Sequence, residues 1–184
     1  MIGDKYAEAL GSGLKLSVVN KLNLAQNRLH PSGGLKVLQG LNFGVRELDL
    51  SNNRLGETQA CIEHLATIIK DRRYHIEKLI LDSNKLGDAH VQVLAEALMI
   101  SSYKPLKVLS LGENQIGDVG IEAIAEMLDV NSTGLKELRL LWNNITSKGG
   151  NKLADSLKSN SQLRVLDLSW NALGSGSSPG EVGN

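Results

Sequence analysis

"LKELRLLWNNI" (residues 135–145) is one of six copies of an eleven-position pattern that runs through this chain of 184 residues. Leucine or another aliphatic residue occupies the first, fourth, sixth and eleventh positions, and asparagine occupies the ninth. Successive asparagines are 26, 31, 30, 29 and 28 residues apart, at Asn27, Asn53, Asn84, Asn114, Asn143 and Asn171. Such near-constant spacing is typical of repeat proteins, in which each unit packs on its neighbours along one axis.

The residues of the pattern predict a short strand followed by a turn. Aliphatic residues at positions four and six point to the same side of a strand, because strand side chains alternate with a period of two. The asparagine amide carries both donors and an acceptor, so it can satisfy backbone groups in a turn that no strand pairing reaches. Stacked copies are therefore expected to form a ladder of asparagine amides.

A helix is expected after each turn. In "GDAHVQVLAEAL" (87–98) and "GDVGIEAIAEML" (117–128), apolar residues recur at helical spacing. The aspartate after the glycine lies at the helix N-terminus, where an acceptor and a negative charge are both favourable. "HPSGGLKVLQGL" (30–41) predicts a brief helix, and the extra residues after Gly56 predict a longer or irregular one. Because one strand and one helix cannot bury both apolar faces alone, the units are expected to stack.

From Val19 to Leu173 this repeat resembles the leucine-rich repeat family, in its long-repeat, ribonuclease-inhibitor-like class. The resemblance implies an α/β solenoid, a horseshoe with a parallel sheet on the concave face and helices on the convex face. It also implies recognition of a protein partner, usually through the concave face. We therefore predict a binding scaffold, and, since catalytic motifs are lacking, one that is not an enzyme and needs no cofactor. An alternative is a GTPase-activating module resembling the Ran GTPase-activating protein, although no residue here can be matched to a catalytic role.

Residues 1–173 are predicted to form one leucine-rich-repeat domain, with a partial N-terminal repeat before six strand-turn units. "DKYAEAL" (4–10) resembles the back half of a repeat helix without its preceding strand, and "GSGSSPGEVGN" (174–184) predicts a flexible tail. Neither end resembles the polar capping repeats that solenoids need. We therefore expect either a piece of a longer repeat protein or weak self-association through the uncapped terminal repeats.

The candidate partner-binding residues lie in the last two copies. Position eight is Trp142 and Trp170 there, whereas the four earlier copies carry polar residues, namely Gln26, Asn52, Ser83 and Glu113. Since neighbouring strands lie about 4.8 Å apart, the two tryptophans are expected to be adjacent, and exposed Trp beside Arg is typical of interface hot spots. The predicted binding residues are Trp142, Trp170, Leu141, Arg139, Arg164 and Asp167. The alternative interpretation is that the indole rings lie flat on the edge and shield the turns.

The charge balance argues against two classes of partner. Lys+Arg and Asp+Glu number 20 each, so the formal net charge is zero and gives no general attraction to nucleic acid or to an anionic membrane. A basic row at position ten (Arg28, Arg54, Lys85) is expected to be a solvated edge that neighbouring carboxylates neutralise, the candidates being Glu47, Asp49, Glu77 and Asp82. We expect neither nucleic acid nor a membrane as a partner, and the sequence contains no run of about 18–20 apolar residues.

Catalytic and metal chemistry are also not expected. The single cysteine, Cys61, excludes an internal disulfide and a Cys-based zinc cluster, and a free thiol suits a reducing, cytoplasmic location. We expect Cys61 to be buried in a helix. The histidines show no metal-ligand spacing, and the chain has no phosphate loop or nucleophile motif, so no metal site and no catalytic residue is predicted.

Overall fold

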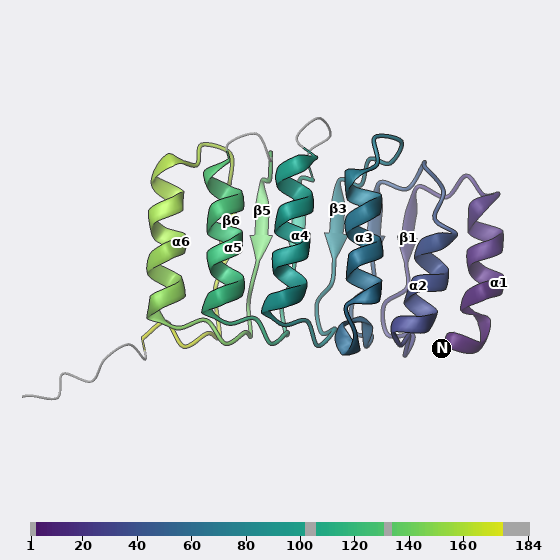
Figure 1. The fold of residues 1–184 in the computed structure, drawn as a ribbon, viewed down its shortest axis with the longest axis horizontal. Coiled ribbons are helices and arrows are strands. Elements are labelled where there is room, and N and C mark those ends of the chain that lie inside the picture. The colour runs from purple at the N-terminus through teal and green to yellow at the C-terminus, as the bar shows by residue number, and fades with distance from the viewer. Residues whose placement is uncertain (1–2, 102–105, 131–133, 175–184) are drawn as a thin grey trace, which may run out of the picture.

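The computed structural model describes residues 3–101, 106–130 and 134–174. Within these ranges, helices and three-residue strands alternate along the chain (Figure 1). The helices are α1 (Gly3–Lys15), α2 (Pro31–Gln39), α3 (Ala60–Lys70), α4 (Asp88–Ile100), α5 (Asp118–Asp129) and α6 (Ser147–Ser159). The strands are β1 (Lys21–Asn23), β2 (Glu47–Asp49), β3 (Lys78–Ile80), β4 (Val108–Ser110), β5 (Glu137–Arg139) and β6 (Val165–Asp167).

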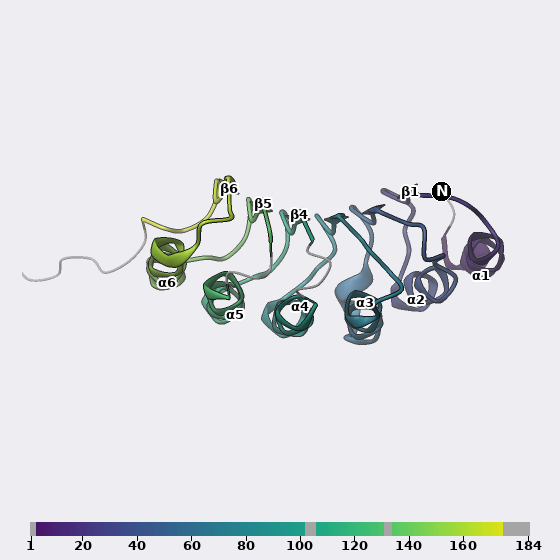
Figure 2. The ribbon, with the colours of Figure 1, turned by 90° about the horizontal axis from the view of Figure 1, so that it is seen from above.

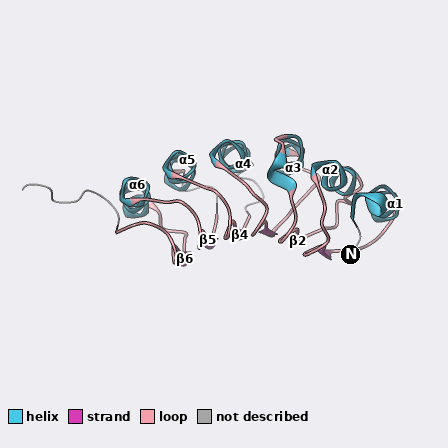
Figure 3. Ribbon diagram, turned by 90° about the horizontal axis from the view of Figure 1, so that it is seen from below, coloured by secondary structure: helices cyan, strands magenta, loops and turns pink. Residues whose placement is uncertain are grey.

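The strands form one parallel sheet in the order β1-β2-β3-β4-β5-β6, which is also their order in the sequence. Equivalent residues pair across every neighbouring strand, as Leu48 does with Leu79 and Leu109 with Leu138. Seen along the strands, the sheet lines the inside of a curve and the helices lie outside it (Figures 2 and 3). The predicted α/β solenoid, with a concave sheet and convex helices, is therefore confirmed.

The aliphatic positions of the repeat form one continuous core between the sheet and the helices. Leu79, Leu81 and Leu86 of the third copy are all fully buried, and the inward faces of the helices pack on such residues from the other side. The last copy differs, because Leu166 and Leu168 are only partly buried. Within the described ranges no strand follows β6 to cover them, and self-association through this end stays a prediction.

The asparagines form the predicted ladder. The Nδ2 of Asn84 donates to the carbonyl oxygens of Leu81 and Asp82 in its own turn, at 3.2 and 3.0 Å, and to that of Leu50 in the preceding repeat, at 2.9 Å. Its Oδ1 accepts from the backbone N–H of Leu55, also in the preceding repeat. The same contact back to the preceding repeat recurs at Asn53, Asn114, Asn143 and Asn171. Each amide therefore closes its own turn and joins two repeats.

Both irregular repeats that the sequence predicts are present. Helix α2 has nine residues, and a Cβ on its Gly34 would lie 2.4 Å from Leu55 Cδ2, so glycine is needed for close packing there. The second copy contains a 3₁₀ turn, η1 (Leu55–Glu57), before α3. At the N-terminus the prediction was incomplete, because α1 is a helix of 13 residues that begins at Gly3 rather than the back half of one.

The aspartates of the Gly-Asp pairs bond to the next repeat. Asp88 lies in the first turn of α4, as predicted, but its Oδ1 accepts from the backbone N–H of Gly117, the N-cap of α5, at 2.6 Å. Asp118 likewise accepts from the backbone N–H groups of Thr146 and Gly149, at 2.9 and 3.1 Å, and from the Thr146 hydroxyl at 2.6 Å. Each aspartate thus satisfies free donors at the start of the following helix.

Replacing Asp118 by alanine should destabilise the protein by about 1–2 kcal/mol, since helix-start donors then lose their acceptor. Hydrogen bonding by the Thr146 hydroxyl, and by the backbone of Thr146 and Gly149, lowers the pKa of Asp118. A lowered folded-state pKa means that the ionised form stabilises the fold above the ordinary carboxyl range and that this contribution is lost as the pH falls through the folded-state pKa. The difference between wild type and Asp118→Ala should therefore shrink below about pH 4.

Urea unfolding of both proteins between pH 7 and pH 3 measures this difference. Asp155→Ala is the matched control, because Asp155 is an exposed carboxylate whose ion pair is to Lys158 on the same helix. Its removal should leave the unfolding midpoint almost unchanged. Equal unfolding midpoints for the two variants would contradict the role given to Asp118.

Candidate partner-binding surface

The two tryptophans lie together at the strand-end side of the sheet. Trp142 and Trp170 are parallel to within 9°, and their ring centroids are 4.6 Å apart. Trp142 is 51% exposed and Trp170 is 69% exposed, so the stacked pair offers much of its aromatic surface to solvent. Both residues follow neighbouring strands, β5 and β6, whose in-register pairing brings position eight of each copy to the same place. The described residues thus include one contiguous aromatic patch, formed by two repeats.

The backbone at this position does not favour tryptophan. Position eight has a positive φ in all six copies, between 51° and 58°, at Gln26, Asn52, Ser83, Glu113, Trp142 and Trp170. The left-handed conformation costs an L-residue about 1 kcal/mol or more. Asparagine bears less of this cost than other L-residues, and glycine, which has no Cβ, bears none. Two adjacent tryptophans in this conformation are therefore not explained by the local needs of the repeat.

Leu141 lies next to Trp142 in the sequence and extends the apolar surface, but much of the Leu141 side chain packs against the preceding repeat. Its side chain lies over Gly112, position seven of the preceding copy, where a Cβ would be 2.5 Å from Leu141 Cδ2. Leu141 is accordingly partly buried. Gly112 was missed as a contributor to this surface, although it is the only glycine at position seven among the six copies.

Arg139 and Asp167 lie side by side on the concave face, as cross-strand partners on β5 and β6. The Nε of Arg139 lies 2.5 Å from the Oε1 of Glu137. Asp167 accepts from the hydroxyl and the backbone N–H of Ser169, at 2.6 and 3.0 Å. These hydrogen bonds, with the charge of Arg139, lower the pKa of Asp167, so an ionised carboxylate lies beside a guanidinium on the two strands that precede the tryptophans.

Arg164 is not brought to the tryptophans. It precedes β6, whereas Trp170 follows it, so the two residues lie at opposite ends of the strand. The guanidinium donates to the carbonyl oxygens of Ser161 and Leu163, at 2.9 and 3.1 Å. Arg46 makes the same contacts at the start of β2, with the carbonyl oxygens of Phe43 and Val45. Arg164 therefore braces the loop before its strand, and it is not part of the rim of the patch.

Two of the three cations of the basic row at position ten, Arg54 and Lys85, lie beside a carboxylate that the sequence did not indicate. Glu57 Oε1 lies 2.7 Å from Lys85 Nζ and 4.0 Å from an Arg54 nitrogen, and its Oε2 lies 2.9 Å from His30 Nδ1. Hydrogen bonds from Lys85 and His30 lower the pKa of Glu57. Among the described residues, the ion pairs of Arg54 and Lys85 involve none of the carboxylates expected from the sequence, which were Glu47, Asp49, Glu77 and Asp82.

Chemically reactive groups are scarce in the described part of the chain. Cys61 is fully buried, as predicted, and burial raises the pKa of its thiol to about 12. Within residues 3–101, 106–130 and 134–174, no three His, Cys, Asp or Glu residues gather in a way that could hold a metal ion. The helices of the same ranges include none with the length and apolar character needed to cross a membrane.

Comparisons with known proteins agree with the architecture. Family models described as leucine-rich repeat match residues 44–65, 104–125, 131–154 and 159–176. The ribonuclease inhibitor of Sus scrofa is 34% identical over 157 residues, which are 85% of this chain and 28% of that protein. Leucine-rich repeat-containing protein 73 of Homo sapiens is 35% identical over 167 residues, covering 88% of this chain and 52% of that protein.

The chain therefore spans between about a quarter and a half of the length of these relatives. Their similarity extends over most of the chain, and the repeat matches fall on strands and turns that the structure shows in register. Sequence pattern, fold and relatives lead to one conclusion: the chain belongs to the leucine-rich repeat family, in its ribonuclease-inhibitor-like class.

Proposed function

We propose that this chain is a protein-binding scaffold and that its partner docks on the C-terminal end of the concave face, with Trp142 and Trp170 as the anchor. The observation that carries the proposal is the stacked, half-exposed pair in a backbone conformation that disfavours bulky side chains. Large aromatic side chains that become buried on binding supply much of the affinity of protein interfaces.

The neighbouring groups support a polar rim. Arg139 is half-exposed, and Asp167 is ionised at neutral pH beside it. A rim of charged groups around an apolar centre is the usual anatomy of a protein interface. The relatives support the same class of function, since the name of one of them states that it inhibits ribonuclease, which is itself a protein.

The test is affinity capture with three forms of the chain. Wild type and Val119→Ser, which alters an exposed apolar residue on α5, should retain the same partner, and the double variant Trp142→Ala/Trp170→Ala should lose it. Retention of the same proteins by all three forms would place the contact elsewhere. A GTP hydrolysis assay with a panel of small GTPases separates the scaffold from the GTPase-activating alternative.

A further inference from the structure

The zero net charge of the chain conceals a separation of charge between the two edges of the sheet. The strand-start edge comprises the described residues from the last residue of each helix to the first residue of the next strand. It lies at the top of Figure 1, where the arrows of β1, β3 and β5 begin. This edge holds ten cations, Lys15, Lys21, Arg46, Lys70, Arg72, Arg73, Lys78, Lys107, Lys136 and Arg164, against five carboxylates, Glu47, Asp71, Glu77, Asp129 and Glu137.

The opposite, strand-end edge has the reverse balance. From the last residue of each strand to the first residue of the next helix there are four cations, Arg28, Arg54, Lys85 and Arg139, against seven carboxylates, Asp49, Glu57, Asp82, Asp88, Glu113, Asp118 and Asp167. Two edges of opposite sign on a neutral molecule orient a charged partner before contact. The strand-start edge is therefore the side that attracts an anion.

A groove of about 400 Å³ lies where this basic edge meets the concave face. It is lined by Asn20, Lys21, Arg46, Glu47, Glu77, Lys78, Lys107 and Val108, which come from the first four copies. The groove thus contains four cations and two carboxylates, and both carboxylates are already matched. Lys21 Nζ lies 2.7 Å from Glu47, and Lys107 Nζ lies 2.5 Å from Glu77.

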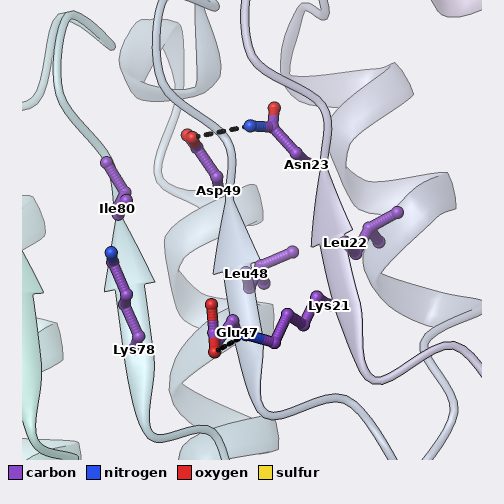
Figure 4. A pocket seen from close by; sticks show the side chains of 8 residues that line it. All are labelled: Lys21, Leu22, Asn23, Glu47, Leu48, Asp49, Lys78 and Ile80. Atoms are coloured by element: carbon purple, nitrogen blue, oxygen red, sulfur yellow. Dashed lines mark hydrogen bonds and ion pairs between the residues drawn. The ribbon is translucent and has the colours of Figure 1, made fainter.

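The two remaining cations differ in what they can offer a ligand. The Arg46 guanidinium is held by carbonyl oxygens of Phe43, Val45 and His75. Lys78 has no carboxylate within ion-pair distance among the described residues. Figure 4, a view of the adjoining depression, shows its ammonium beside Ile80 and turned away from Glu47. Lys78 lines the groove, and its ammonium, beside Ile80 on the concave face, is therefore a charge available to a group that lies along the groove.

We propose that this groove binds an acidic segment of a protein partner and that Lys78 pairs with a carboxylate of that segment. The inference rests on the proposed function and adds to it the charge of the partner and a second contact on the same face. An extended segment suits the groove because the lining cations lie at the starts of successive strands, about 4.8 Å apart. The residues that line the groove lie on or just before the strands that form the inside of the curve (Figure 2).

The probe is a fluorescein-labelled octapeptide, (Glu-Ser)₄, followed by fluorescence anisotropy, with (Gln-Ser)₄ as the neutral comparison. Wild type should bind the acidic peptide at least ten-fold more tightly than the neutral one, and Lys78→Glu should weaken that binding by at least about ten-fold. Lys78→Gln, which keeps the side-chain length, should weaken it by about five-fold. Arg28→Glu, the same charge change at the opposite edge, should alter it by less than about two-fold.

Three results would overturn the proposal. The first is that the wild type shows no preference for the acidic peptide over the neutral one. The second is that Lys78→Glu and Arg28→Glu, both correctly folded, weaken peptide binding equally. The third is that phosphatidylserine vesicles or a single-stranded oligonucleotide bind as tightly as the acidic peptide and in a way that depends on Lys78. The double variant Trp142→Ala/Trp170→Ala should keep the peptide affinity. A partner that needs the tryptophans while the acidic peptide fails to bind would refute the groove and leave the scaffold proposal standing.

Discussion

Replacing Trp142 or Trp170 by alanine is expected to weaken partner binding by about 2 kcal/mol or more for each residue, while stability changes little. The reason is geometric: the two rings stack on each other, and in the free chain Trp142 is 51% exposed and Trp170 is 69% exposed. Their truncation therefore removes far less buried area from the fold than it removes from an interface that covers them. The partner is the protein captured by the wild-type chain, and calorimetric titration gives its affinity.

The backbone provides a sharper version of this test. Since φ is 51° at Trp142, glycine removes the backbone strain at this position, whereas alanine retains it. Trp142→Gly should therefore unfold at a temperature no lower than that of Trp142→Ala and still lose the partner. Gln26→Ala is the matched control, because Gln26 is an exposed residue with the same backbone conformation in the first copy. A double alanine variant that melts earlier yet binds normally would show that the rings shield the turns instead.

Replacing Asn84 by leucine is expected to lower the free energy of unfolding by about 3 kcal/mol, the upper end of the cost of leaving a buried polar group unpaired. Asn84 is fully buried, and the backbone N–H of Leu55 donates to its side chain. In the leucine variant that N–H has no acceptor, and three carbonyl oxygens each lose one donor. A urea titration followed by circular dichroism measures the change.

The control for this prediction lies in the same kind of turn. Asn144 occupies position ten of the fifth copy and is exposed, so Asn144→Leu makes the same chemical change without burying it. We expect a shift of less than about 0.5 kcal/mol for it. An unchanged midpoint for Asn84→Leu would mean that the ladder does not hold the repeats together.

The sequence predicts the elements of this fold well because each one is encoded locally. Leu79 lies on β3 and Leu81 directly follows that strand, both are buried, and the amide chemistry of Asn84 follows from its residue type. Contacts between repeats are harder to predict, since they depend on how two units dock. Asp88 was placed correctly at a helix start, but its bond to Gly117 joins residues 29 positions apart and is visible only once the stacking is known.

The candidate site shows the same division. Repeat register alone predicts that Trp142 and Trp170 are neighbours, because both occupy position eight of adjacent copies. The register does not indicate where a long side chain turns: Arg164 extends back to Ser161 and Leu163, away from the tryptophans. The basic groove could not be anticipated from a net charge of zero, since opposite charges on two edges cancel in the sum. The opposite charges of the two edges become visible once the structure assigns each described charged residue to the edge on which it lies.

Because neighbouring strands pair in register, the sheet fixes the distance between contacts that a ligand makes on different strands. The groove lies at the start of β1 to β4 and the tryptophan pair follows β5 and β6, so the part of their separation that runs across the strands is a whole number of strand spacings of about 4.8 Å each. Duplicating one internal repeat between them would move the two contacts apart by one such step and leave both intact. A ligand that spans both contacts would then be selected by length as well as by chemistry, and gain or loss of a repeat would change the length selected in discrete steps.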